Sequence, residues 1–293
     1  MAVYTTINDS GLFMNTVLYT GTGTGGSDRQ ITGVGFQPDL VWIKNRDSVQ
    51  ENVLADAVRG ATKSLDSAST AVEITNDLRV GAFIADGFQL GSGAVQNRVN
   101  ELGSGMVAWN WKAGTTSGLS GGTITPSGYS FNTTSGFSII TYTGTGSAGT
   151  IPHGLGAVPQ AVICKKLDGV DGWFSYHEPL GNTGRLMLDN TNAAAYDAGY
   201  WDATSPTSSV FSVRGNGGNN ATGDAYVAYC FADVAGYSKF GSYTGNGDAD
   251  GPFLYTGFRP AFILQKITNT TSSWHLHDNK RGPFNPDLNV LYP

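Results

Sequence analysis

Tyr142-Thr-Gly-Thr-Gly146 is followed by Gly156-Ala-Val-Pro159 and then by Ala161-Val-Ile-Cys-Lys165, and this stretch decides the fold because the chain contains it three times. The copies lie much further apart than the about 20 to 50 residues of a solenoid repeat, which indicates tandem domains. The other copies are Tyr19-Thr-Gly-Thr-Gly23 with Gly35-Phe-Gln-Pro38 and Leu40-Val-Trp-Ile-Lys44, and Tyr243-Thr-Gly-Asn-Gly247 with Gly257-Phe-Arg-Pro260 and Phe262-Ile-Leu-Gln-Lys266.

The repeat sets the expected domain organisation. Apolar residues alternate in the second copy and the chain turns at glycine, which is typical of antiparallel strands. We therefore predict an all-β chain of tandem antiparallel β-sandwich domains, jelly-roll-like and joined by Gly/Ser/Thr linkers. The predicted parts are an N-terminal arm (1–16), a first unit (17–114), a linker (115–136), a second unit (137–236) and an incomplete third unit (237–293).

Two segments of the first unit are interpreted through the repeat. Gln50–Asp66 resembles a helix by propensity, but it aligns with a second-unit sequence that reads strand, turn, strand, so we predict strands in both. Val107, Trp109 and Trp111 share one face of a predicted strand by its period of two. Their counterparts are Val227, Tyr229 and Phe231. Both columns are expected to fill a sandwich interior.

Composition excludes several classes of protein. Charged residues make up 14% of the chain, against about 25% in an ordinary domain, and 41 residues are glycine. The net charge of −6 argues against nucleic-acid binding, which needs a basic face. No apolar run approaches the length of a membrane span, and no basic segment with an apolar core marks the N-terminus. Cys164 and Cys230 are interpreted as buried apolar residues.

Glycine-rich motifs in the chain do not predict a cofactor. Gly21-Thr-Gly23 and Gly144-Thr-Gly146 both begin the dinucleotide fingerprint, but each leads to a proline and another strand, where the fingerprint requires a helix. Gly118-Leu-Ser-Gly-Gly122 matches the nucleophile elbow, but it lies in the predicted linker without the necessary strand and helix. We predict neither nucleotide binding nor a catalytic residue here.

Two oxygen- or nitrogen-rich segments resemble metal sites incompletely. Asn246, Asp248 and Asp250 match the first half of a calcium loop, but Gly257 stands where the bidentate glutamate belongs, so a turn is the favoured interpretation. His275 and His277 share a strand face, and an interface or solvated pair is favoured over a metal pair. No metal site is predicted.

Charged residues recur in one column of the repeat. Asp56 and Arg59 of the first unit align with Asp278 and Arg281 of the third. A carboxylate and a guanidinium three residues apart around a turn most often form a structural ion pair. Hydrolysis of a glycoside needs a second carboxylate at a suitable distance, and no such partner recurs.

The best ligand candidate is an aromatic loop of the second unit. Tyr196, Tyr200 and Trp201 lie beside Asp197 and Asp202. Exposed aromatic rings can stack on sugar rings, so the three aromatic residues are candidate ligand-binding residues. The alternative, that they pack on the edge of the sandwich, is at least equally favoured.

The repeats resemble tandem all-β repeats in structural proteins of marine bacteriophages, known as virion or tail-fibre proteins with a domain of unknown function. The resemblance covers about residues 17–293 and is most specific in the second unit. It is carried by Tyr142-Thr-Gly-Thr-Gly146, His153-Gly-Leu-Gly-Ala-Val-Pro159, Trp173-Phe-Ser-Tyr-His177, Tyr226-Val-Ala-Tyr-Cys-Phe-Ala232 and the run from Tyr237 to Gly247.

The resemblance implies a non-enzymatic virion component, assembled in the host cytoplasm, most often a tail fibre or appendage. Its expected partners are other virion proteins, copies of itself (with a trimer favoured) and a host-surface glycan. It implies no catalytic residues and no cofactor. A tail-associated glycan depolymerase and a capsid-surface decoration protein are the alternatives.

The third unit is about half the length of the others and carries apolar residues on one predicted face. A half-domain would expose that face and an unpaired strand edge to water. We therefore expect the face to be covered by another polypeptide or by sequence beyond Pro293, with the latter favoured. The apolar residues are Phe262, Leu264, Trp274, Leu276, Leu288 and Leu291.

Overall fold

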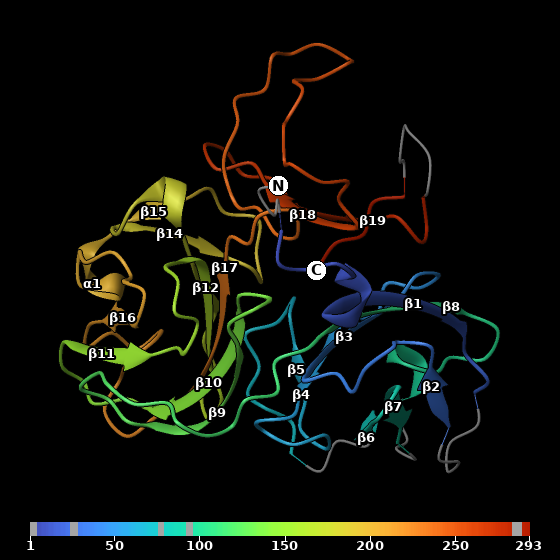
Figure 1. The fold of residues 1–293 in the computed structure, drawn as a ribbon, viewed down its shortest axis with the longest axis horizontal. Coiled ribbons are helices and arrows are strands. Elements are labelled where there is room, and N and C mark those ends of the chain that lie inside the picture. The colour runs from blue at the N-terminus through green and yellow to red at the C-terminus, as the bar shows by residue number, and fades with distance from the viewer. Residues whose placement is uncertain (1–4, 24–28, 76–78, 92–95, 283–288) are drawn as a thin grey trace.

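The structure is a computed structural model that describes residues 5–23, 29–75, 79–91, 96–282 and 289–293. Antiparallel strands dominate, which confirms the all-β prediction (Figure 1). No helix in the described ranges is long and apolar enough to cross a membrane. The helical elements are α1 (Ala198–Trp201) and the 3-10 turns η1 (Ser10–Leu12), η2 (Gln96–Arg98) and η3 (Glu178–Leu180).

The first unit contains a five-stranded sheet and a three-stranded sheet. The five-stranded sheet has the order β1-β8-β3-β4-β5, and the smaller sheet has the order β2-β7-β6. The strands are β1 (Met14–Thr20), β2 (Gln30–Thr32), β3 (Leu40–Asn45), β4 (Val53–Asp56), β5 (Leu65–Asp66), β6 (Val80–Ile84), β7 (Gly87–Leu90) and β8 (Gly105–Trp111).

The second unit repeats this arrangement with extra strands at its edges. Its large sheet has the order β15-β14-β13-β12-β17-β10-β9, and β11 pairs with β16 in a second sheet. The strands are β9 (Pro126–Asn132), β10 (Phe137–Thr143), β11 (Gly149–Pro152), β12 (Pro159–Lys166), β13 (Trp173–His177), β14 (Gly184–Met187), β15 (Ala195–Tyr196), β16 (Val210–Val213) and β17 (Ala225–Ala232).

The two large sheets share one strand order. Strands β10, β17, β12, β13 and β14 follow one another as β1, β8, β3, β4 and β5 do. The register agrees too, since Trp42 pairs with Trp109 and the aligned Ile163 pairs with Tyr229. Gln50–Asp66 contains strands β4 and β5, so the prediction of strands over this segment is confirmed.

Each large sheet packs its outer face on the small sheet of the same unit. In the first unit Val41 and Ile43 pack with Ile31 and Phe88. In the second unit, Val162 and Tyr142 pack in a separate cluster with Ile151 and Phe211. Alternating strand residues therefore fill two outer cores, and the fold is β-sandwich-like.

The inner faces of the two large sheets meet in one shared core. Trp109 lies at its centre, fully buried, with its ring edge-on to Trp42 at 5.9 Å between centroids. The two units are therefore joined by side chains and not merely by a linker. The shared core comprises Leu40, Trp42, Leu54, Leu65, Val107, Trp109, Trp111, Ala113, Phe137, Ile139, Trp173, Leu188, Val227, Tyr229 and Leu276.

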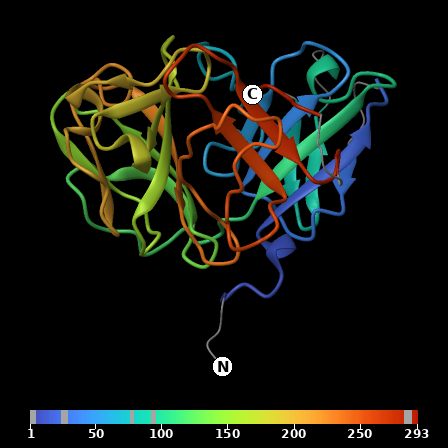
Figure 2. The same ribbon diagram turned by 90° about the horizontal axis from the view of Figure 1, so that it is seen from above.

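The third unit is a hairpin that closes the open end of this core. Strands β18 (Phe262–Lys266) and β19 (Trp274–Asp278) lie between the two larger groups of strands (Figures 1 and 2). Leu276 is fully buried, and Trp274 and Leu291 pack partly buried against the same core. The first two units therefore cover part of this face, while Phe262, Leu264, Trp274 and Leu291 are only partly buried. The expectation that another polypeptide or further sequence covers the rest stays a prediction, and Leu288 lies outside the described residues.

Hydrogen bonds between the units follow a cyclic order. The three donors occupy aligned positions of the repeat. Each acceptor is the backbone carbonyl of the residue that follows a leucine, and that leucine pairs with the adjacent strand of its own unit; the leucines are Leu65, Leu186 and Leu291. The three units therefore surround the shared core with pseudo-threefold symmetry. The bonds are Trp173 Nε1 to Asp66 O at 3.1 Å, Trp274 Nε1 to Met187 O at 2.8 Å, and Asn52 Nδ2 to Tyr292 O at 3.1 Å.

Two expected boundaries are corrected. Residues 126–132 of the predicted linker form β9, which pairs with β10 at the edge of the large sheet. The first part of the linker is also held in place, because Thr115 bridges to Phe131. The predicted arm 1–16 includes the first residues of β1, which begins at Met14 and pairs with β8. Backbone pairing overrides the flexible composition of both segments.

Candidate functional site

The aromatic loop places its three candidate residues in three environments. Tyr196 belongs to β15 and is 65% exposed. Tyr200 lies in α1, stacked on Phe174 at 4.7 Å between ring centroids and covered by the Arg185 guanidinium at 4.2 Å. Trp201 is only 2% exposed, and its Nε1 donates to Gly184 O at 3.1 Å.

Only part of this loop can therefore contact a ligand. Asp197 caps α1 by accepting from Gly199 N at 2.8 Å, which turns Trp201 inward into the outer core of the second unit. Trp201 is corrected to a packing residue, because a large apolar ring next to a sheet is more stable buried than exposed. Tyr196 remains accessible, and Tyr200 is half-buried beside Arg185.

The first carboxylate–guanidinium pair lies inside the molecule, at the junction of the first and second units. Arg59 Nε contacts Asp56 Oδ2 at 2.5 Å, and its Nη1 contacts Glu73 at 3.0 Å. Tyr229 of the second unit donates its hydroxyl to Asp56 Oδ2 at 2.7 Å. Burial raises the pKa of Tyr229, so the hydroxyl keeps the proton that it donates. The predicted structural ion pair is confirmed and joins two units.

The second pair repeats this geometry at the junction of the third and first units. Arg281 Nε contacts Asp278 Oδ2 at 2.6 Å, and Trp109 Nε1 donates to the same oxygen at 3.1 Å. Trp109 aligns with Tyr229, so each pair receives a hydrogen bond from the central aromatic residue of a neighbouring unit. In the second unit the aligned position is His177, where burial lowers the imidazole pKa.

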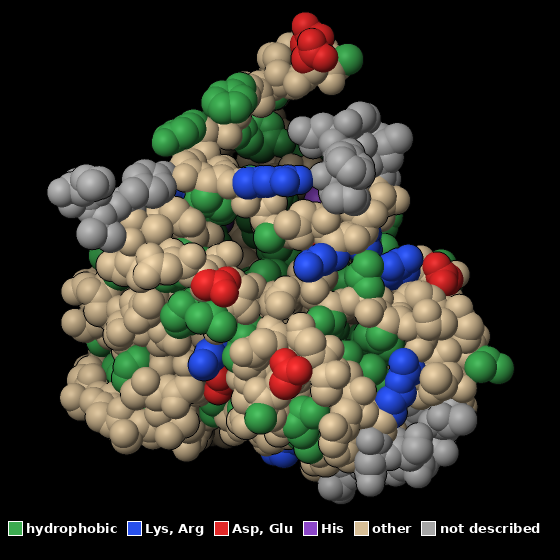
Figure 3. Space-filling model, turned by 45° about the vertical axis from the view of Figure 1, so that its right-hand side comes forward, with side chains coloured by type: hydrophobic (Ala, Val, Ile, Leu, Met, Phe, Trp, Pro, Cys, Tyr) green, Lys and Arg blue, Asp and Glu red, His purple; other side chains and the backbone are tan. Residues whose placement is uncertain are grey.

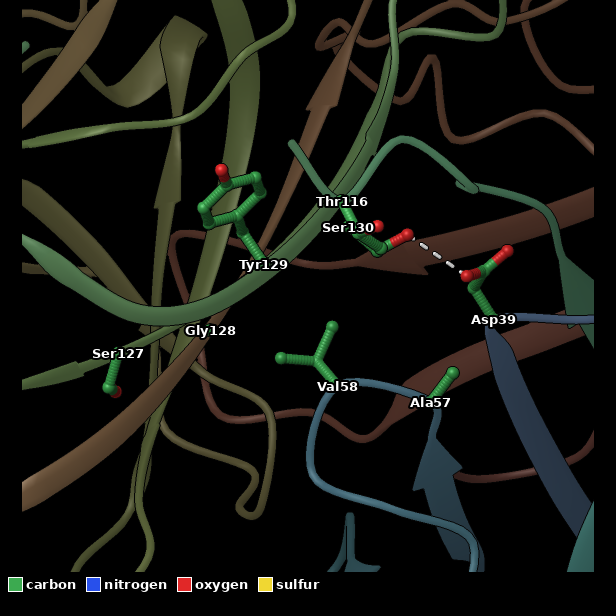
Figure 4. Close-up of a pocket in the computed structure, with 8 residues that line it drawn as sticks. All are labelled: Asp39, Ala57, Val58, Thr116, Ser127, Gly128, Tyr129 and Ser130. Carbon is green, nitrogen blue, oxygen red and sulfur yellow. Dashed lines mark hydrogen bonds between the residues drawn. The ribbon is translucent and has the colours of Figure 1, made fainter. Parts of the chain in front are cut away.

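A pocket of about 380 Å³ lies between the first two units, beside β9. Asp39 enters it from the first unit and accepts a hydrogen bond from Ser130 Oγ at 3.0 Å (Figure 4). Its carboxylate also accepts from Ala113 N at 2.8 Å. Burial raises the pKa of Asp39, and these two donors oppose the shift. Asp39 is the one carboxylate among the lining residues, which are Asp39, Ala57, Val58, Thr116, Ser127, Gly128, Tyr129 and Ser130.

Aligned lysines also connect neighbouring units. Lys165 of the second unit donates to Thr70 O of the first at 3.3 Å, and Lys266 of the third donates to Thr191 O of the second at 3.2 Å. The side chain of Lys165 is fully buried. Burial lowers its pKa to about 8, although Asp171 and Asp189 act in the opposite direction.

Lys165 predicts a specific pH dependence of stability. Its pKa in the folded protein lies below the ordinary value of 10.5, so between about pH 8 and 10.5 Lys165 is protonated to a greater extent in the unfolded chain than in the folded protein. The contribution of Lys165 to the free energy of unfolding therefore rises with pH across this window. Urea denaturation should show that Lys165→Met removes this rise. Lys280→Met, at an exposed lysine, should leave it in place, and parallel profiles for wild type and Lys165→Met would contradict the prediction.

The remaining candidate residues do not form a metal centre or a disulfide. Within the described part of the chain, no group of three or more His, Cys, Asp or Glu side chains could hold a metal ion. Asn246 Oδ1 accepts from Asp248 N at 3.0 Å, as in an ordinary turn, and the His275 ring lies edge-on to Tyr292. Cys164 and Cys230 are free and buried, which confirms the interpretation of both as apolar residues.

Sequence analysis missed the residues that join the units. Asp39 and Ser130 come together only because β9 joins the large sheet. The roles of Trp109 and Tyr229 as donors were also missed, although their alignment in the repeat was a usable signal. An aromatic residue with a polar N–H or O–H at a fully buried aligned position needs a hydrogen-bond partner.

Comparison with known proteins places the chain in a family. A family model described as Domain of unknown function (DUF7483) matches residues 9–293. No curated protein and no solved structure matches the chain. The family model spans all three units as one domain, in keeping with their shared core. The chain therefore belongs to the DUF7483 family, a domain of unknown function.

Proposed function

We propose that this protein is a non-enzymatic structural component of a phage particle, a tail fibre or other appendage that acts in assembly or in binding a host-surface glycan. One observation carries the non-catalytic part of the proposal. The buried charged residues Asp56, Arg59 and Asp278 contact one another or aromatic residues of neighbouring units. These charged groups hold the units of the molecule together, which suits a structural protein.

The topology of the two complete units is also part of the proposal. In a jelly roll, the first strand pairs with the last and the second with the penultimate, in two packed sheets. In the first unit β1 pairs with β8 and β2 pairs with β7. We therefore propose that the complete units are jelly-roll-like sandwiches, an architecture used by viral capsid proteins and lectins.

The proposal that the protein is a phage component rests on the sequence resemblance, and the position of the protein in an intact virion tests it. Antibodies against the full chain should label the tail or surface appendages of a virion in immuno-electron microscopy. We expect the protein to be assembled into the particle in the host cytoplasm. Labelling of the capsid surface would favour the decoration protein, and absence from purified particles would contradict the proposal. The expected homotrimer stays a prediction, which mass measurement of the purified chain can check.

One observation favours the depolymerase alternative. The pocket at Asp39 holds a buried carboxyl with a raised pKa, as a general acid requires. A glycosidase usually needs a second carboxyl at about 5 to 9.5 Å, and the pocket lining contains none. Release of reducing ends from host polysaccharide, abolished by Asp39→Asn, would establish the alternative and overturn the non-enzymatic proposal.

Glycan binding would use the exposed tyrosine of the aromatic loop. Tyr196→Ala is expected to weaken binding to host-surface polysaccharide by about fivefold, because one stacking contact contributes about 1 kcal/mol. Titration calorimetry with purified polysaccharide measures the change. Tyr292→Ala is the control, since that tyrosine is 54% exposed and belongs to the third unit, where its ring contacts His275. Equal effects of the two substitutions would contradict the role of Tyr196.

A further inference from the structure

The tyrosine that begins each copy of the repeat is differently placed in the third unit. Tyr19 donates its hydroxyl to Val99 O at 2.8 Å, and Tyr142 donates to Asn219 O at 2.7 Å. Both acceptors precede the last strand of their unit, β8 or β17. Tyr243 keeps the same motif but is 51% exposed.

The glycines of the motif show the same difference. A Cβ on Gly21 would lie 1.8 Å from Glu101 O, and one on Gly144 would lie 2.1 Å from Ala221 O. Only glycine fits these positions, because the backbone before β8 or β17 passes so closely. At Gly245 and Gly247 a Cβ would meet no atom of the described residues within 4 Å. The third unit thus carries the same glycines, but no described segment passes as close to them as the backbone of Glu101 and Ala221 passes to Gly21 and Gly144.

The segments that fill this position in the first two units share a sequence pattern. Thr22 N donates to Asn100 Oδ1 at 3.0 Å, and Thr145 N donates to Asn220 Oδ1 at 2.8 Å. From each asparagine onward, glycine, valine and two aromatic residues follow at the same spacing. The patterns are Asn100, Gly103, Val107, Trp109, Trp111 and Asn220, Gly223, Val227, Tyr229, Phe231.

One edge of β18 is open. Strands β3 and β12 each lie between two partners, whereas β18 pairs only with β19 within the described residues. Arg46 N donates to Gly105 O, and the aligned Leu167 N donates to Ala225 O. By alternation along a strand, Leu264 and Lys266 turn their N–H groups to the open edge.

Apolar side chains beside this edge are exposed. Ile263 is 43% exposed, while the aligned Val41 and Val162 are fully buried. Phe253 and Tyr255, on the segment that projects from the body, are 90% and 78% exposed. Figure 3 shows hydrophobic side chains on this projection, below its acidic tip. Monomeric proteins seldom leave such groups in water next to an unpaired edge.

We propose that the open edge of β18 and the motif 243–247 together form a docking site for one extended segment of a partner polypeptide. The segment has the pattern Asn-x-x-Gly-x-x-x-Val-x-aromatic-x-aromatic and adds to β18 as an antiparallel strand. Its first aromatic residue pairs with Leu264, as Trp109 pairs with Trp42 and Tyr229 with Ile163. The same residue faces His177, which completes the cyclic set of junctions.

A partner strand fits better than a second copy of this chain. Both segments of the chain with this pattern already lie in their own sheets, as β8 and β17. Two copies paired edge to edge through β18 would leave Gly245 and Tyr243 without the close backbone that their counterparts contact. The proposal is independent of the phage assignment.

The binding experiment uses the full chain and a synthetic peptide of residues 99–113, Val-Asn-Glu-Leu-Gly-Ser-Gly-Met-Val-Ala-Trp-Asn-Trp-Lys-Ala. Fluorescence anisotropy of the labelled peptide should show saturable one-to-one binding. N-methylation at Trp109 removes a hydrogen bond to β18 and should weaken binding at least about tenfold. A peptide of scrambled order is the matched control and should not bind.

Register is tested by disulfide formation. Gln265 aligns with Ile43, which pairs with Ala108. Gln265→Cys should therefore form a disulfide with the peptide carrying Ala108→Cys, because pairs without mutual hydrogen bonds bring Cα atoms to about 4.5 Å. A peptide carrying Asn110→Cys should react much less. Native Cys164 and Cys230 are buried and remain unreactive.

Three outcomes overturn the proposal. One is the absence of saturable binding by the 99–113 peptide, and another is equal disulfide yield from the Ala108→Cys and Asn110→Cys peptides. The third is spontaneous disulfide-linked dimerisation of the Gln265→Cys protein in preference to peptide capture, which would show that a second copy occupies the edge. Saturable binding with the predicted register supports it.

Discussion

Replacing Asp56 by asparagine is expected to lower the free energy of unfolding by about 3 to 5 kcal/mol. Asp56 is fully buried and contacts Arg59, whose side chain is 1% exposed. It also accepts the hydroxyl of Tyr229 from the second unit. Without the carboxylate, Glu73 is the one charged partner of the guanidinium among the described residues. The loss therefore includes the cost of a poorly compensated buried charge and a weakened junction between two units.

Urea denaturation monitored by far-UV circular dichroism measures this loss. Lys239→Gln is the matched control, because it breaks an ion pair with Asp233 in which the lysine is 52% exposed. Exposed pairs contribute at most about 1 kcal/mol, so the control should unfold almost as the wild type does. Similar losses for the two variants would mean that the Asp56 junction does not stabilise the fold.

Replacing Trp109 by alanine is expected to cost about 3 to 5 kcal/mol and to release the third unit from the body. Trp109 is fully buried and lies edge-on to Trp42 and to Phe262 of β18, at centroid distances of 5.9 and 5.8 Å. It also donates to Asp278 in β19. One side chain thus contacts both strands of the hairpin, and its removal leaves a cavity at the centre of the shared core.

Limited proteolysis reports the release separately from global stability. In Trp109→Ala, cleavage between β18 and β19 should become faster at denaturant concentrations where the first two units remain folded. Trp109→Phe keeps most of the volume but loses the N–H donor, so it should show a smaller loss of about 1 to 3 kcal/mol. Unchanged proteolysis of the hairpin in Trp109→Ala would show that Trp109 does not hold it.

The repeat made much of the fold predictable from sequence. Alignment of the copies corrected the helical appearance of Gln50–Asp66, because shared ancestry of fold outweighs a weak local propensity. Strand periodicity also placed Val107, Trp109 and Trp111 on one inward face. The Asp56–Arg59 pair followed from its spacing around a turn.

The arrangement of the units was not predictable in the same way. Periodicity says that both faces of a central strand are apolar, but it does not say whether the second face meets the same unit or a neighbour. Treating the units as separate sandwiches therefore missed the shared core and the burial of Leu276. Composition likewise suggested a flexible linker where β9 pairs with β10. The sequence left open whether Trp201 binds a ligand or packs on the sandwich, because the four-residue turn that buries it carries no periodic signal.

The hydrogen bond from Asn52 to Tyr292 joins residues 240 positions apart, and this has a consequence for synthesis on the ribosome. Strand β8 emerges long before β18 and β19, which cover Trp109. Because synthesis proceeds at about 5 to 20 residues per second, the inner face of the first unit stays uncovered for roughly ten to thirty seconds until β18 and β19 are made. During that interval the nascent chain exposes tryptophans to which a ribosome-associated chaperone would bind. Slower translation of the 3′ end of the message would lengthen this interval and so raise the risk of aggregation.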